Sequence, residues 1–361
     1  MNQAFIPGLE LSQLLYEESV RPILDGKFTG LVHSAGLLGP GSDVLGFDTP
    51  QSTDHDWGPR LILFLRKGDH ESKRDPIEQA LRRELPVEVR GYPTNLGRHE
   101  DGTAVMVRVG GGPIDHGVTI HTVRGWMTDV LGFDPTGEIR PADWVSVPEN
   151  RLLIVTAGRV FHDGLATLEP LRRKLRYYPT DVWLYLMSAQ WRRIAQEEPF
   201  MARCGQAGDE LGSRLIAGRL VQYLVRLCCL MERRYAPYVK WLGSAFSRLD
   251  CASDLAPLLT RVLEADSWEE RQTWLTAAYE LAARMHNALG ITDPLPAEVS
   301  PFHRRPFMVI RADRFANAIR AVIRNPEVLA LPEHLGGWDQ VVDSTDALGY
   351  WARFRGVWAG G

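Results

Sequence analysis

The sequence predicts an α/β (α+β) protein: an amino-terminal domain built on a mixed sheet, residues 1–167, followed by a carboxy-terminal helical domain, residues 168–361. Two patterns predict this division. The first part contains short apolar runs bounded by turn residues, which is typical of buried strands. From about residue 168 the apolar residues recur every three to four positions over long segments, which indicates amphipathic helices. A chain of 361 residues is also long for a single hydrophobic core.

The first domain is predicted to combine helices and strands. Apolar residues spaced by three to four positions predict an opening helix over 9–24. Strands are predicted over 29–38, 54–65, 87–90 and 118–123. A short helix is predicted over 76–85, because Asp75 can cap it and Pro76 suits its first position.

The second domain is predicted to be dominated by long helices. The segments with a helical apolar period are 180–196, 209–234, 252–265, 268–289 and 312–323. In the second of these segments, regularly spaced leucines make a continuous apolar stripe, while arginines occupy other positions on its surface. We expect a substrate cleft between this domain and the first one.

The composition is that of a soluble protein without an extended nucleic-acid surface. Its 41 basic and 45 acidic residues give a formal net charge of −4, whereas nucleic-acid surfaces need a basic excess. The longest apolar stretches fall short of the roughly eighteen residues that span a bilayer. The start of the chain lacks the charged and apolar regions of a secretory leader. The four cysteines show no Cys-x-x-Cys spacing, and so we expect a reduced, cytoplasmic protein.

One stretch carries the pattern of a catalytic site. It begins with Gly41-Ser42 and reaches Asp54-His55-Asp56 about a dozen residues later. Residues i and i+2 of a strand point to the same face, so Asp54 and Asp56 would present adjacent carboxylates whose repulsion favours a bound cation. Mg²⁺ suits such ligands, because it prefers oxygen atoms and binds carboxylates together with substrate phosphates. The Gly41-Ser42 turn offers backbone N–H groups and a hydroxyl to a phosphate chain.

This pattern resembles the signature of the nucleotidyltransferase superfamily, with its DNA polymerase beta-like fold: an apolar strand, Gly-Ser, about ten residues and then Asp-x-Asp. The string from Gly41 to Arg60 is similar to a bacterial branch described as a domain of unknown function and related to the antibiotic nucleotidyltransferases. Further stretches fit that branch: 203–205, 209–212, 235–243, 305–307 and 339–340. The resemblance runs from about residue 30 to about residue 345.

The resemblance implies a metal-dependent transfer of a nucleoside monophosphate, AMP from ATP in the first instance, to an acceptor hydroxyl with release of pyrophosphate. Asp54 and Asp56 would hold Mg²⁺ or Mn²⁺ as catalytic residues, and Gly41 and Ser42 would bind the phosphates of ATP or another nucleoside triphosphate. The acidic charge balance favours a small-molecule acceptor over a nucleic-acid acceptor, and a protein or RNA hydroxyl stays open as the acceptor. Two different functions stay open beside this one: a catalytically weak nucleotide-binding regulator, and a nucleotidyltransferase of a toxin–antitoxin type.

A third carboxylate on a neighbouring strand usually completes such a site and acts as the general base. Glu88 is the first choice, because two valines flank it in an apolar-acid-apolar pattern, with Asp163 and Asp115 as alternatives. If the neighbouring strand is instead 118–123, it offers no acid, and the chain departs from the family pattern.

Further residues are candidates for nucleotide binding. Arg60 shares the face of the two aspartates in an unbroken strand, although the Gly58-Pro59 pair can bend it. Through the resemblance, Arg203, Lys240 and Trp241 would contact the triphosphate or stack on the base. The alternative for these three is structural: an inter-helix ion pair for Arg203, and a tightly packed helix end for the other two.

Overall fold

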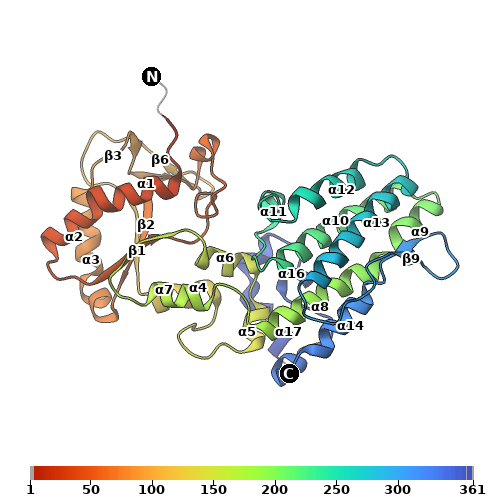
Figure 1. Ribbon diagram of the computed structural model, residues 1–361. Helices are drawn as coiled ribbons and strands as arrows, with labels where there is room; N and C mark the ends of the chain where they lie inside the picture. The colour runs from red at the N-terminus through yellow and green to blue at the C-terminus, as the bar shows by residue number, and fades with distance from the viewer. Residues whose placement is uncertain (1–3, 355, 360–361) are drawn as a thin grey trace. The chain divides into compact units, whose positions relative to one another are not determined.

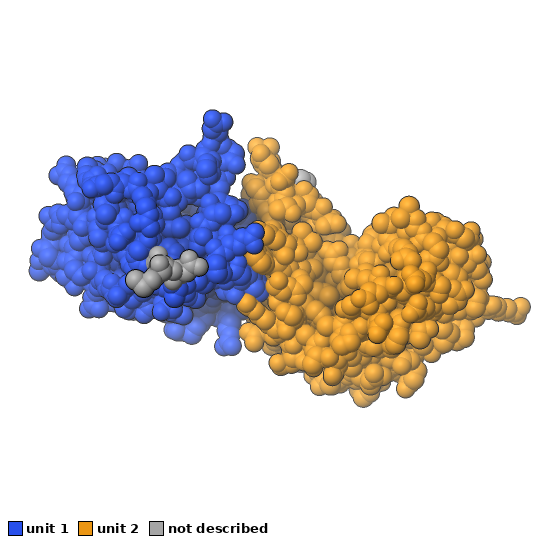
Figure 2. Space-filling view, turned by 90° about the horizontal axis from the view of Figure 1, so that it is seen from above, with its two compact units in different colours: residues 1–138, 151–176 blue, residues 139–150, 177–361 orange. Residues whose placement is uncertain are grey.

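The computed structural model describes residues 4–354 and 356–359, and it confirms the α/β class (Figure 1). The chain divides into two compact units: unit 1 is Met1–Glu138 with Arg151–Arg176, and unit 2 is Ile139–Asn150 with Tyr177–Gly361 (Figure 2). Unit 1 holds the main sheet, and unit 2 is mostly helical.

Unit 1 is built on a four-stranded mixed sheet in the order β7-β2-β1-β8. Its strands are β1 (His33–Leu37), β2 (Arg60–Leu65), β7 (Gly117–His121) and β8 (Arg159–Asp163). β1 pairs antiparallel with β2 and β8, while β2 and β7 are parallel. All residues of β2 after Arg60 are buried, as expected for an apolar strand inside a sheet that is covered on both faces.

Helices and two small hairpins surround this sheet. α1 (Gly8–Leu15) and α2 (Arg21–Lys27), joined by a π-helical turn, confirm the predicted opening helix. α3 (Lys67–Glu84) lies in the crossover that the parallel pair β2–β7 requires. The other elements are α4 (Val123–Leu131), α6 (Glu149–Thr156, which crosses the division between the units), α7 (Leu168–Lys174), β3 (Glu88–Val89) with β4 (Tyr92–Pro93), and β5 (Leu96–Arg98) with β6 (Ala104–Met106). Leucines of α1, β2 and α3 meet in one buried core.

Two predicted elements of unit 1 differ in extent from the structure. The strand predicted over 54–65 begins only at Arg60, because Asp56 and Gly58 have φ angles of 47° and 140°, which an extended strand does not contain. The helix predicted from Pro76 begins at Lys67 and contains that proline in its interior. An ion pair between Lys73 and Asp69, four residues apart at 2.7 Å, supports its first turns.

Unit 2 contains the predicted long helices. They are α8 (Thr180–Glu197), α10 (Glu210–Met231), α12 (Ala252–Glu264), α13 (Trp268–Ala288) and α14 (Asp313–Val322). Shorter elements complete the unit: α5 (Pro141–Ser146), α9 (Phe200–Gln206), α11 (Val239–Phe246), α15 (Pro326–Leu329), α16 (Trp338–Val341), α17 (Gly356–Ala359), and β9 (Ser300–Pro301) with β10 (Met308–Val309). No helix in the described parts of the chain is long and apolar enough to cross a membrane.

α8 lies at the centre of unit 2, where it packs against both α10 and α14. Trp191 of α8 is fully buried and stacks on Phe315 of α14, with ring centroids 4.4 Å apart. α10 begins after Asp209, whose Oδ1 accepts a hydrogen bond from the backbone N–H of Gly212 at 2.8 Å. Asp209, which belongs to a stretch that fits the bacterial branch, therefore caps a helix.

Candidate functional site

The predicted phosphate-binding turn follows shortly after β1. Gly39 and Gly41 have φ angles of 97° and 145°, in the region that favours glycine. A side chain at Gly41 would collide with the guanidinium of Arg60 and the carboxylate of Asp43. Ser42, the next residue, is partly exposed. The backbone angle and the close packing therefore both require glycine at position 41.

Arg60 reaches this turn from the first position of β2. Its Nη2 donates to Asp43 Oδ1 at 2.7 Å and to the Pro40 carbonyl at 3.3 Å. The Asp43 side chain is fully buried, and its Oδ2 has no hydrogen-bond partner among the described residues. Burial raises the pKa of Asp43, and the positive charge of Arg60 opposes that rise. The structure thus brings Gly41 and Arg60, two predicted site residues, together around a buried ion pair.

Another acid of the same string anchors the loop to helix α1. Asp48 Oδ2 accepts hydrogen bonds from the backbone N–H of Gly8 at 2.7 Å and from Trp57 Nε1 at 3.0 Å. A Cβ atom at Gly8 would lie 2.6 Å from the Cβ of Asp43, so the start of α1 is pressed against the loop. Asp43 and Asp48 therefore hold the loop in place, a role that the sequence pattern did not identify for Asp43.

Asp54 and Asp56 lie on the loop before β2, not on the strand where we expected them. Asp54 is the last residue of a 3-10 turn, its side chain is 62% exposed, and its Oδ1 lies 2.8 Å from His55 Nδ1. Asp56 is exposed and has a left-handed backbone. Its N–H donates to the Ala104 carbonyl at 2.7 Å, and its Oδ1 accepts from the Ala104 N–H at 3.1 Å. The expected same-face alignment on a strand is therefore wrong, because a contact with β6 sets this backbone.

The structure offers few protein ligands for a metal ion at this loop. Among the described residues, no group of three or more His, Cys, Asp or Glu side chains could hold a metal ion. Mg²⁺ in nucleotide sites is usually held by one or two carboxylates plus substrate phosphates and water. Asp54 and Asp56 are exposed carboxylates of this loop, engaged with His55 and Ala104 respectively, and their role as metal ligands stays a prediction.

The structure does not place an acid on the strands beside β2. Its neighbours in the sheet are β1 and β7, and β7 carries no carboxylate. Glu88 belongs to the separate β3–β4 hairpin, where it is exposed and accepts a hydrogen bond from Arg108 at 3.1 Å. The expectation that Glu88 stands on a strand adjacent to β2 is therefore wrong, since the valines beside it belong to a local hairpin. Its catalytic role stays a prediction.

The two alternative acids have structural partners. Asp115 pairs with Arg82 at 2.6 Å. Asp163 accepts from Ser34 Oγ at 2.6 Å, and its other oxygen accepts from the Glu169 N–H at 3.1 Å, close to the start of α7. Both carboxylates are thereby engaged in holding unit 1 together.

The remaining candidates lie in unit 2. Arg203 is exposed on α9, and Lys240 is exposed on the first turn of α11. The Lys240 Nζ lies 5.1 Å from the ring centroid of Trp241, which is a cation–π contact. The structure therefore pairs Lys240 with Trp241 and places Arg203 on a different helix.

The sequence pattern did not identify a buried acidic pair in unit 2, Glu149 and Asp339. Glu149 Oε2 accepts from the Ala236 N–H at 2.6 Å, and the Glu149 N–H donates to Asp339 Oδ2 at 2.7 Å. Arg226 Nη1 lies 3.7 Å from Asp339 Oδ1. Burial, together with the negative charge of Asp339, raises the pKa of Glu149 to about 7. These residues come from three distant parts of the chain, and only the stretches with Ala236 and Asp339 carried a signal in the sequence.

Comparisons with known proteins give a family match over part of the chain and a similar solved structure. Residues 144–242 match a family described as "Domain of unknown function (DUF4037)". No curated protein matches the sequence. Among solved structures, the chain is similar to a nucleotidyltransferase-like protein from Exiguobacterium sibiricum 255-15, with 13% sequence identity, coverage of 85% of this chain and 89% of that chain, and a TM-score of 0.29. Neither comparison assigns a reaction to this chain.

Proposed function

We propose that this chain is a nucleotidyltransferase that moves a nucleoside monophosphate, AMP from ATP, to the hydroxyl of a small-molecule acceptor and releases pyrophosphate. The observation that carries the proposal is the meeting of a glycine turn and an arginine in unit 1. Gly41 lies against the guanidinium of Arg60, and the connection between them also carries two exposed carboxylates, Asp54 and Asp56.

The residues at this turn have distinct tasks in the proposed reaction. The backbone N–H groups and the Ser42 hydroxyl at Gly41-Ser42 would bind the phosphate chain, and the packing of Arg60 against Gly41 would place the guanidinium beside it. Only Nη2 of Arg60 donates to described residues, so its other N–H groups would donate to phosphate oxygens. Asp54 and Asp56 would hold Mg²⁺ or Mn²⁺, which supplies charge neutralisation to the triphosphate when bound.

One observation favours a second candidate, a nucleotide-binding regulator without transfer activity. The strand β7 beside β2 carries no carboxylate, and Glu88 lies on a separate hairpin. A general base for the acceptor hydroxyl would then have to come from Glu88 or from another part of the chain. Measurement of binding and turnover in the same samples separates the two candidates.

The test measures ATP binding by calorimetry and pyrophosphate release with Mg²⁺, ATP and a metabolite extract. Asp56→Asn keeps an oxygen for the Ala104 N–H, and asparagine tolerates the left-handed backbone, so its effect reports the lost charge. Asp25→Asn, on α2 with a 66% exposed side chain, is the matched control. We expect release that Asp54→Asn and Asp56→Asn abolish and the control preserves.

Other results would decide against transfer. ATP binding without release from any fraction of the extract, unchanged by Glu88→Gln, would favour the regulator. Absence of both ATP binding and release would contradict both candidates. Release that survives Asp54→Asn and Asp56→Asn would show that these carboxylates do not hold the metal.

A further inference from the structure

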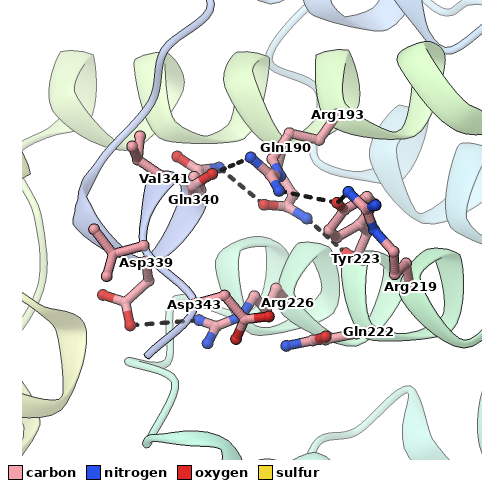
Figure 3. A pocket seen from close by; sticks show the side chains of 11 residues that line it. Gln190, Arg193, Arg219, Gln222, Tyr223, Arg226, Asp339, Gln340, Val341 and Asp343 are labelled. Atoms are coloured by element: carbon pink, nitrogen blue, oxygen red, sulfur yellow. Dashed lines mark hydrogen bonds and ion pairs between the residues drawn. The ribbon is translucent and has the colours of Figure 1, made fainter. Parts of the chain in front are cut away.

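Unit 2 contains a cavity of about 390 Å³ that the proposed reaction does not use. It lies between α8, α10 and the segment that starts in α16 (Figure 3). Three arginines line it: Arg193 from α8, and Arg219 and Arg226 from α10. Its volume is within the range of small-molecule sites. Three guanidinium groups around one cavity of this size indicate a site for an anion.

Two of these arginines are held in position by one tyrosine. Arg193 Nη2 and Arg219 Nη2 each donate to Tyr223 Oη at 2.9 Å. The guanidinium of Arg193 also lies 4.7 Å from the centroid of the Tyr223 ring. Tyr223 Oη in turn donates to Glu197 Oε1 at 3.3 Å. Figure 3 shows both arginines gathered at this hydroxyl. Their positions are therefore fixed before any ligand binds, which lowers the entropic cost of binding.

The third arginine has an unused donor. The Arg226 side chain is only 13% exposed, and its Nη1 is buried without a hydrogen bond among the described residues. Its nearest carboxylate oxygen, Asp339 Oδ1, is 3.7 Å away, which is too long for a hydrogen bond. A buried charged N–H group without an acceptor is costly, and an oxygen atom in the cavity would remove that cost. Arg226 therefore lacks an acceptor that a ligand could supply.

The acids near the cavity offset part of the arginine charge. Asp339 and Asp343 are the carboxylates in its lining, and Glu197 forms an ion pair with Arg219 Nη2 at 2.5 Å. Burial raises the pKa of Asp339, and it raises that of Glu149, whose N–H Asp339 accepts. Burial and mutual repulsion therefore disfavour two full negative charges on this pair. Arg226 is the guanidinium whose charge is least compensated, and Nη2 of Arg219 is the only one of its nitrogen atoms that is engaged with the described residues.

We propose that this cavity binds a small molecule through one phosphate group, held by Arg219 and Arg226 with Arg193 behind them. A phosphate offers several acceptor oxygens and up to two negative charges, which matches converging guanidinium forks better than a single carboxylate does. The Gln222 side chain also lines the cavity and would donate to a further oxygen. The inference does not depend on the proposed nucleotidyl transfer, because all of these residues belong to unit 2.

The experiment titrates the full-length chain by calorimetry at low salt, without divalent metal and without nucleotide. The probes are inorganic phosphate, glycerol 3-phosphate and succinate. Arg226→Gln and Arg219→Gln should each weaken phosphate binding about tenfold or more, since each removes a charge-assisted hydrogen bond. Arg214→Gln is the matched control, because it makes the same substitution on α10 at a residue whose nearest acid is Asp266, outside the cavity.

The comparison of the two phosphate probes identifies the source of the phosphate group. Tighter binding of glycerol 3-phosphate than of inorganic phosphate would assign a phosphorylated metabolite, and equal binding would assign free phosphate. Absence of heat with both probes up to about 10 mM would overturn the proposal, as would binding of succinate alone. Phosphate binding that neither cavity variant weakens would overturn it as well.

A folding check and separate assays keep the test decisive. Arg226→Gln also disturbs the Asp339 contact, so its fold is checked by circular dichroism. If it does not fold, Arg219→Gln, whose side chain is 54% exposed, carries the test alone. The two proposals fail separately, because phosphate binding to unit 2 is measured without nucleotide or divalent metal, whereas pyrophosphate release is measured with both.

Discussion

Replacement of Gly41 by alanine should destabilise unit 1 and leave unit 2 intact. The added methyl group would collide with the guanidinium of Arg60 and the carboxylate of Asp43, whose ion pair spans 2.7 Å. Alanine would also have to adopt a φ angle near 145°, which L-residues avoid. Both effects act on the same turn, so the fold should respond there first.

The size of the loss follows from these two effects. The unfavourable backbone angle costs about 1–2 kcal/mol. Breaking a buried ion pair by removing one partner costs about 3–5 kcal/mol. Here the Arg60 guanidinium is only displaced and can turn toward water, so the cost should be about 2 kcal/mol. Arg60 is already 19% exposed, which makes that rotation accessible. We therefore expect unit 1 to lose about 3–4 kcal/mol in its free energy of unfolding.

Hydrogen exchange followed by mass spectrometry measures this loss within unit 1, using peptides from β1 and β2. Gly26→Ala is the matched control: its Cβ meets no atom within 4 Å, and alanine favours its helix α2. In the control variant, the backbone amides of β1 and β2 should be protected from hydrogen exchange as well as they are in the parent chain. A difference between the two variants below about 1 kcal/mol would refute the reasoning, since it would show that the turn adapts to a side chain.

Three further changes test other parts of the structure. Burial lowers the pKa of His286 from 6.5 to about 4. The free energy of unfolding should therefore fall by about 2 kcal/mol as pH decreases from 7 to 5, because the folded state disfavours the protonated ring. In urea titrations, His286→Leu should make the free energy of unfolding less dependent on pH over this range. Asp163→Ala should cost about 2–3 kcal/mol by thermal denaturation, because it removes the acceptor of a buried Ser34 hydroxyl. Because the pKa of Glu149 rises from 4.5 to about 7 on folding, its ionisation lowers stability as pH increases from about 4.5 to about 7. Glu149→Gln should therefore stabilise the chain more at pH 8 than at pH 5, because it removes a charge that burial and the repulsion from Asp339 both disfavour.

The fold class and the long helices were predictable because their signals are local. The leucines of α10 from Leu220 onward are buried as predicted, whereas Leu211 and Leu215, at its start, are 70% and 62% exposed. The apolar run in β2 reflects burial of a central strand. The start of α3 was not predictable in this way. Pro76 resembles a first-turn residue, yet the helix begins at Lys67 in a polar segment without an apolar period.

The candidate site was predictable in composition but not in geometry. Gly41 and Arg60 follow from the sequence pattern, while the ion pair that joins them through Asp43 depends on the antiparallel pairing of β1 and β2. The backbone of Asp56 is set by Ala104 in β6, far along the chain. Glu149 had no signal at all, because its partners converge only in the folded unit.

The string from Gly41 to Asp56 combines acids of two kinds, and this decides how mutations in it must be interpreted. Asp43 and Asp48 are engaged with Arg60 and with the start of α1, so replacing either should reduce activity by loosening the loop. Asp54 and Asp56 are exposed, and their replacement by asparagine should leave hydrogen exchange of β1 and β2 unchanged. Loss of activity alone therefore cannot identify a metal ligand here. A metal ligand is an acid whose replacement abolishes transfer while the exchange protection of β1 and β2 stays at the parent level. If replacing any of the four acids increases exchange to the same extent, the division into structural and metal-binding acids is contradicted.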